Sequence, residues 1–122
     1  RVHLEGARLS RADFREARLF KADLRNAYLH EANLTSAKLS GANLKGAHLE
    51  GALLQSAHFE RAKLQGVRFG QADLSDTYFY GAEFDDASLR SILSARSRSW
   101  MKAKFDPAVL DSLKEIENKR KN

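Results

Sequence analysis

A Leu or Phe recurs at every fifth position over most of the chain, from Leu4 to Leu89, without a gap or an insertion. All 18 of these central positions hold Leu or Phe, and the residue two places earlier is Ala in 15 of the units. Charged and polar residues occupy most of the positions between them. The chain therefore has a hydrophobic period of five residues, and the predicted structure must bury every central side chain on the same side of the backbone.

Neither regular secondary structure satisfies this period. Five residues advance an α-helix by about 500°, so successive centres would turn away from one another by about 140° and form no apolar face. In a continuous strand the side chains alternate with period two, so an odd spacing would place successive centres on opposite faces. The pattern instead predicts short extended segments separated by corners that restore the direction of each central residue.

The corners are predicted at the second position after each centre. Six of the seven glycines lie at this position, and glycine adopts the positive φ of tight turns without a steric penalty. The Ala and the central residue, two places apart, then point together into the interior. The six corner glycines are Gly6, Gly41, Gly46, Gly51, Gly66 and Gly81.

These units resemble the pentapeptide-repeat family, whose pattern Ala-Asp/Asn-Leu-x-x is present at residues 22–24, 32–34, 42–44 and 72–74. The resemblance covers residues 2 to about 91. It implies an all-β solenoid, a right-handed quadrilateral β-helix with four pentapeptides in each coil. The 18 units then make about four and a half coils. We expect residues 1–91 to form this β-helix and residues 92–122 to form a lid segment and a short helical cap.

The segment after the repeat carries the signals of a helix. Asp106 is a favourable N-cap and Pro107 suits the first helical position, while Phe105 can pack on Leu110 as a hydrophobic staple. We predict a lid over residues 92–105 and a helix from residue 107 to about 118. Its apolar residues form either a cap over the last coil, which is the preferred interpretation, or a homodimer interface. They are Trp100, Met101, Phe105, Val109, Leu110, Leu113 and Ile116.

With four units in each coil, outward side chains twenty residues apart stack in columns. Two opposite faces then combine basic and aromatic side chains, which makes them candidate binding surfaces for a protein partner; the alternative is that they only keep the rod soluble. The first, named the Tyr28 face, carries Arg8, Tyr28, His30, His48 and Arg68, with Glu50 alongside. The second, named the Phe20 face, carries Arg18, Phe20, Lys38, His58, Tyr78 and Tyr80.

The same register brings His30, His48 and Glu50 near one another on neighbouring coils. Diagonal Cα separations of about 7–8 Å are compatible with a shared metal ion. However, the chain has no clustered histidine motif and no cysteine. The sequence therefore predicts no metal and no other cofactor.

The formal net charge of +5 is unevenly distributed. Residues 1–69 carry 12 Lys or Arg against 7 Asp or Glu, residues 70–89 carry none against 5, and residues 90–122 carry 9 against 4. The positive excess is compatible with an acidic partner. No apolar run reaches the roughly 18 residues that span a bilayer, so no membrane segment is predicted in this stretch.

A filled tube is expected to have no deep cleft, and the register suggests neither a Ser-His-acid set nor a phosphate-binding loop. The prediction is therefore a non-enzymatic scaffold for protein–protein interaction with an unidentified partner. The resemblance adds one alternative, because some pentapeptide-repeat rods mimic DNA and inhibit or regulate a type II topoisomerase, gyrase. Those rods are strongly acidic, whereas this chain is positive. The basic faces add a second alternative, direct binding of nucleic acid.

Overall fold

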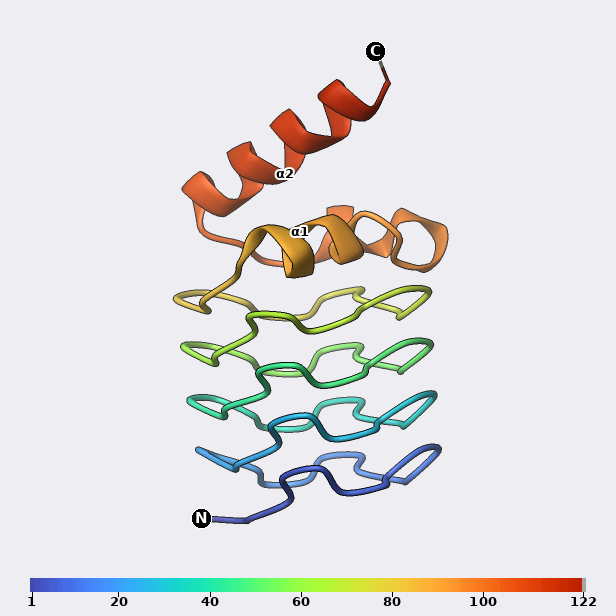
Figure 1. Cartoon of the computed structure of the whole chain (residues 1–122), viewed down its shortest axis with the longest axis vertical. Coiled ribbons are helices and arrows are strands. Elements are labelled where there is room, and N and C mark those ends of the chain that lie inside the picture. The colour runs from blue at the N-terminus through green and yellow to red at the C-terminus, as the bar shows by residue number, and fades with distance from the viewer. Residues whose placement is uncertain (122) are drawn as a thin grey trace.

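The computed structural model describes residues 1–121. The chain winds into a stack of coils from its N-terminus, and three helical elements lie beyond the far end of the stack (Figure 1). These are α1 at Asp86–Ile92, the 3₁₀ helix η1 at Arg96–Lys102 and α2 at Pro107–Arg120. Among the described residues, none of the helices is both long enough and apolar enough to cross a membrane.

The coils have four sides. Parallel bridges join residues twenty apart, from His3 with Asp23 to Lys63 with Glu83, and twenty residues hold four pentapeptides. Backbone hydrogen bonds connect neighbouring coils beside each bridge; the N–H of Asp23, for example, donates to the carbonyl of Val2 at 2.8 Å. Each side is so short that it contributes isolated bridges rather than a strand of several residues.

The corners fall at the predicted positions. At each one, the N–H three residues after a centre donates to the carbonyl of that centre, as Ala7 does to Leu4 at 3.0 Å. The second residue after the centre has positive φ at every corner from Gly6 to Gly81, including non-glycine residues such as Ser56, with φ 60°. This is the pattern of a type II turn. Most corners therefore hold a side chain in a left-handed conformation that glycine adopts more easily.

Two corner substitutions should shift stability in opposite directions. In Gly66→Ala the new Cβ meets only ordinary contacts, the nearest being 3.5 Å away at the backbone nitrogen of Gly46. The left-handed φ alone should then lower the free energy of unfolding, by about 1–2 kcal/mol. In Ser56→Gly the same strain is relieved, and we expect a gain of up to about 1 kcal/mol. Urea unfolding of both variants measures the two signs, and equal signs would contradict this account.

Two columns of inward side chains fill the tube. The central residues from Leu19 to Phe79 are at most 5% exposed, and every Ala of the small column from Ala22 to Ala72 is fully buried. Thr77 replaces Ala in the small column, and its buried hydroxyl donates to the carbonyl of Leu54 at 2.7 Å. The interior of these coils is therefore occupied by side chains that solvent scarcely reaches.

The extended repeat ends earlier than predicted. The sequence analysis assigned a unit centred on Leu89 to the solenoid, but residues Asp86–Ile92 form α1. Asp85 begins this helix with a capping box: its carboxylate accepts the N–H of Ser88 at 2.9 Å, and the Ser88 hydroxyl accepts the N–H of Asp85 at 3.0 Å. This start signal was overlooked because Leu89 happens to continue the five-residue period.

The chain then returns across the end of the solenoid and adds one side of a further coil. Lys104 forms a parallel bridge with Tyr78, and the ring of Phe105 stacks on that of Phe79 with 5.0 Å between centroids. Phe105 thus occupies a central position of the solenoid. Asp106 is the N-cap residue of α2 by position, as predicted, but its carboxylate accepts the N–H of Gly81 at 2.8 Å instead of a helix N–H.

The C-terminal segment also supplies acceptors for the N–H groups along the last coil. The Ser91 hydroxyl accepts from Phe69 at 3.2 Å and the Ser99 hydroxyl accepts from Leu74 at 2.9 Å. Without such partners this edge would present free donors to other chains. The other pairs, with the N–H donor first, are Gly66 with Asp85, Gln71 with Ser94, Asp76 with Lys102, Phe79 with Lys104 and Gly81 with Asp106.

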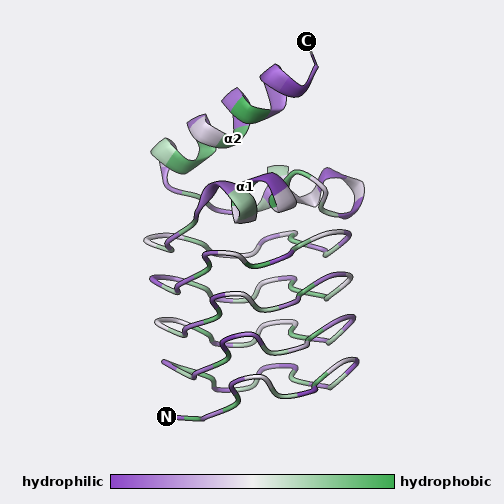
Figure 2. Ribbon diagram, viewed as in Figure 1, coloured by the Kyte–Doolittle hydropathy of each residue, from purple (hydrophilic) through white to green (hydrophobic). Residues whose placement is uncertain are grey.

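The apolar residues predicted for a cap or a dimer interface differ in burial. Three of them are buried within this chain, three are partly buried, and the exposed one is 60% accessible. The C-terminal end of α2 is hydrophilic (Figure 2). Asn122, the last residue of the predicted C-terminal segment, lies outside the described residues. The buried residues are Trp100, Phe105 and Leu113, the partly buried ones Val109, Leu110 and Ile116, and the exposed one Met101.

Candidate functional site

The structure assembles both predicted faces from the twenty-residue register. Parallel bridges connect the members of one column on each face in chain order. The Tyr28 face has the column Arg8, Tyr28, His48 and Arg68, and the Phe20 face has the column Arg18, Lys38, His58 and Tyr78. Each column therefore presents its side chains at the spacing of stacked strands, about 4.8 Å.

The Phe20 face combines exposed aromatic rings with cations that have no carboxylate partner. Phe20 is 51% exposed and Tyr80 is 46% exposed. Neither Arg18 nor Lys38 forms an ion pair with any of residues 1–121. Both cations are available to an external acidic group.

Glu60 lies on the same face, in a second column with Phe20, Ser40 and Tyr80. Neighbouring side chains hold its carboxylate. One carboxylate oxygen accepts the Ser40 hydroxyl at 3.2 Å, and the other lies 3.1 Å from Nδ1 of His58. The His58 ring in turn stacks on Tyr78, with 4.7 Å between centroids. Glu60 is therefore held within the face and forms no ion pair with Arg18 or Lys38.

The Phe20 face includes one residue that the sequence pattern did not predict. Lys104 is exposed and bridges to Tyr78, so it extends the Arg18 column by one position. The predicted repeat ended at about residue 91, and residues 92–105 were expected to form a lid without a position in the column. The sequence did contain a sign of this position, because residues 103–105 are Ala-Lys-Phe, the same order of small, outward and central residues as in a repeat unit. This unit does not continue the five-residue period that runs from Leu4 to Leu89.

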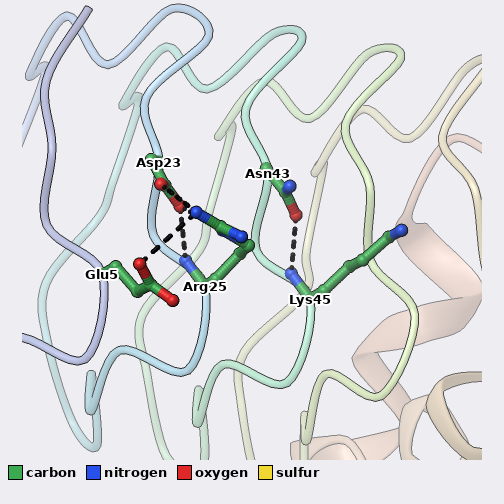
Figure 3. A network of polar contacts seen from close by, with 5 residues as sticks. All are labelled: Glu5, Asp23, Arg25, Asn43 and Lys45. Carbon is green, nitrogen blue, oxygen red and sulfur yellow. Dashed lines mark hydrogen bonds and ion pairs between the residues drawn. The ribbon is translucent and has the colours of Figure 1, made fainter.

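On a neighbouring face, Arg25 is paired with two carboxylates (Figure 3). The Asp23 carboxylate accepts the Nε and Nη2 hydrogens of Arg25 at 2.8 and 2.7 Å, and it also accepts the backbone N–H of Arg25 at 3.2 Å. These side-chain bonds lower the pKa of Asp23 to about 2. Glu5 contacts the same guanidinium at 3.3 Å. Arg25 is therefore already paired, unlike the cations of the Phe20 face.

The same face shows why Asp or Asn commonly precedes the centre of a unit. Asn43 Oδ1 accepts the backbone N–H of Lys45 at 3.1 Å, as Asp23 does from Arg25 one coil earlier (Figure 3). A short polar side chain here satisfies the N–H two residues on, in the manner of an Asx turn. These residues therefore have a structural role.

The Tyr28 face carries a cluster of stacked rings. The centroids of Tyr28 and His48 are 4.8 Å apart with an interplanar angle of 7°, and those of His30 and His48 are 5.4 Å apart with an angle of 23°. Arg8 and Arg68 stand at the two ends of this column, and both are exposed. The register thus brings two imidazole rings together that are 18 residues apart in the chain.

The sequence model for pentapeptide repeats matches residues 1–35, 12–51, 32–71 and 52–91, in 8 copies. The chain belongs to the pentapeptide-repeat family. No curated protein matches it. The family match thus covers the whole stack of coils and extends into α1.

Solved structures of pentapeptide-repeat proteins resemble the chain. One from the cyanobacterium Cyanothece 51142 is 33% identical with a TM-score of 0.69, over 85% of this chain and 60% of that one. One from the Arabidopsis thaliana thylakoid lumen is 28% identical with a TM-score of 0.41, over 66% and 57%. QnrB1, a plasmid-mediated fluoroquinolone resistance protein, is 20% identical with a TM-score of 0.37, over 92% and 66%.

The first of these neighbours implies a right-handed quadrilateral β-helix, which agrees with the four-sided coils of this chain. The chain spans less than two thirds of the length of the first two proteins. The likeness to QnrB1 concerns the fold alone.

Proposed function

We propose that this pentapeptide-repeat chain is a non-enzymatic scaffold that binds an acidic protein surface through its Phe20 face. Proteins of the family are generally structural or interaction modules. One observation carries the proposal: two exposed rings lie on the same face as two cations that lack a carboxylate partner within residues 1–121. An acidic protein surface would pair with the cations while the rings leave water.

A protein partner is favoured over a nucleic acid by the composition of the face. Glu60 interrupts the positive charge of this face, whereas a phosphate backbone would place negative charge along its whole length. A protein surface can instead place its acidic groups opposite Arg18 and Lys38 alone. The exposed rings of Phe20 and Tyr80 are suited to apolar contact with a protein surface. Mimicry of DNA is disfavoured because Arg18, Lys38 and Lys104 make the long column positive, whereas a mimic of DNA needs a negative surface.

We propose further that residues 92–121 cap the solenoid of a monomeric scaffold and do not serve as a dimer interface. Leu113 of α2 is fully buried within a single chain, so the apolar side of the helix is already covered at that point. The hydrogen bonds from the last coil to Ser91, Ser99 and their neighbours also occupy the edge that a second copy would need.

Charge reversal tests the choice of face. Proteins captured from an extract of the producing cells by the wild-type chain should be lost with Arg18→Glu/Lys38→Glu. The matched control Lys45→Glu/Lys63→Glu has the same change in charge on a different face, where both lysines are exposed, and it should retain them. With a purified partner, we expect the first variant to bind roughly tenfold or more weakly, a loss of about 1.4 kcal/mol or more.

Two outcomes would overturn this proposal. If Arg8→Glu/Arg68→Glu abolishes capture and Arg18→Glu/Lys38→Glu does not, the Tyr28 face is the interface. If the wild-type chain binds duplex DNA with an affinity that falls steeply as salt rises, the partner is a nucleic acid. Fluorescence polarisation with a labelled duplex at two salt concentrations measures the second outcome.

A further inference from the structure

We propose that the Tyr28 face binds one divalent transition-metal ion of the zinc type through His30, His48 and Glu50. The sequence pattern alone predicted no metal here, because the three residues form no recognisable motif along the chain. Imidazole and carboxylate ligands together suit Zn²⁺, Ni²⁺ or Cu²⁺ better than Mg²⁺ or Ca²⁺, which prefer oxygen ligands alone.

The ligand atoms already lie near the required positions. One potential ligand atom from each side chain lies within 4.8 Å of the other two. Oε1 of Glu50 is 3.5 Å from Nε2 of His30, and Oε2 of Glu50 is 3.8 Å from Nδ1 of His48. Zinc bonds of about 2.0–2.2 Å place tetrahedral ligands about 3.4 Å apart. Small side-chain rotations, mainly of the half-exposed His30, would bring the three atoms to this spacing.

The solenoid register holds the three residues on a rigid support. His30 and Glu50 follow each other in one column, and His48 lies two residues before Glu50 on the same side of its coil. Backbone hydrogen bonds join the two coils beside these residues, from Leu29 to His48 at 2.8 Å and from Glu31 to Glu50 at 2.9 Å. Ligands on such an ordered backbone lose little further freedom when an ion binds.

Glu50 has an oxygen that the rest of the chain does not satisfy. Oε1 is buried and accepts no hydrogen bond from any of residues 1–121, although an ionised carboxylate can only accept. Leaving such an atom without a partner is unfavourable, and a cation between Glu50 and His30 would remove this penalty. The His48 ring is fixed by its stacking on Tyr28.

The site has room for a further ligand. Gly70 is the next residue of the column that holds His30 and Glu50, and its φ is not in the region that requires glycine. His30, Glu50 and Gly70 line part of a shallow, open hollow of about 470 Å³ on this face. A water molecule or a small anion can therefore complete the coordination of a three-ligand metal ion.

The Phe20 face provides a matched comparison within the same molecule. There His58 lies 3.1 Å from Glu60 and stacks on Tyr78, which repeats the pairing of His48 with Glu50 and Tyr28. However, no second histidine completes the set, because Ser40 occupies the position equivalent to His30. His58 is therefore a surface imidazole in similar surroundings that should not bind the ion tightly.

Isothermal titration calorimetry of the full chain with ZnCl₂ tests the proposal. We expect one equivalent of Zn²⁺ to bind. His48→Gln and Glu50→Gln should each weaken binding by roughly tenfold or more, because each removes one of three ligands. His58→Gln should leave the affinity unchanged. Absence of saturable binding, or an equal loss with His58→Gln, would overturn the proposal.

A second measurement uses the wild-type chain alone and so does not depend on the folding of a variant. In NMR spectra of the histidine side chains, the ring signals of His30 and His48 should shift on addition of one equivalent of Zn²⁺. Those of His3 and His58 should not. Shifts of similar size at all four rings would show only weak surface binding and would also overturn the proposal.

Discussion

Replacing Phe79 with Ala should lower the free energy of unfolding by about 3–5 kcal/mol. Phe79 is fully buried, and its ring stacks between Phe59 and Phe105 with centroid distances of 5.4 and 5.0 Å. It also meets Phe69 edge to face at 5.9 Å. Removing this ring leaves a void beside the rigid coils, and it also removes the aromatic contact between Phe105 and the last coil.

Urea unfolding followed by circular dichroism measures this loss. Phe20→Ala is the matched control, because Phe20 is 51% exposed and its truncation should change the stability by no more than about 0.5 kcal/mol. A double-mutant cycle with Phe105→Ala should show coupling of about 0.5 kcal/mol or more, since the two rings are in contact. Additive effects would mean that Phe105 does not hold the C-terminal segment against the last coil.

The solenoid was predictable because every local signal agreed with it. The spacing of Leu24, Leu44 and the other centres excluded helix and continuous strand, and Gly6 and Gly81 marked corners that the structure places at the same positions. The handedness and the number of sides came from the resemblance, because period five alone requires corners without counting them. The beginning of α1 was not predicted, since Leu89 satisfied the repeat and the helical pattern equally.

The twenty-residue register was enough to predict which side chains share a face, but it did not predict which of the charged side chains form ion pairs. The sequence predicted which side chains share a column, and the bridges from Arg18 to Tyr78 confirm that arrangement. It did not distinguish the unpaired Arg18 from Arg25, which is bound to Asp23. That difference depends on side-chain conformations and not on spacing. The position of Lys104 in the same column was not predicted either, because α1 and η1 lie between it and the preceding repeat units.

The proposed metal site depends on side-chain contacts that the spacing of residues in the sequence does not determine. The register placed His30, His48 and Glu50 on neighbouring coils, but the sequence could not show that a carboxylate oxygen of Glu50 is buried without a hydrogen bond. It also could not show that Tyr28 fixes the ring of His48 by stacking. Three residues without a linear motif can therefore form a compact ligand set when a solenoid brings them together.

Replacing Ala42 with Leu should lower the free energy of unfolding by about 1–3 kcal/mol. Ala42 is fully buried in the small inward column between Ala22 and Ala62 of the adjacent coils, which are also fully buried. Backbone hydrogen bonds on both sides, from Asn43 to Ala22 and from Lys63 to Ala42, both at 2.9 Å, prevent the coils from separating. The larger side chain must therefore displace neighbouring central residues from their preferred rotamers.

Thermal and urea unfolding measure the effect of this substitution. Ala108→Leu is the matched control, because it adds the same atoms at an exposed position of α2 and should change the stability by no more than about 0.5 kcal/mol. If Ala42→Leu proved as stable as wild type, the interior would have room beside the central column. Alanine in the small column would then reflect something other than the width of the tube.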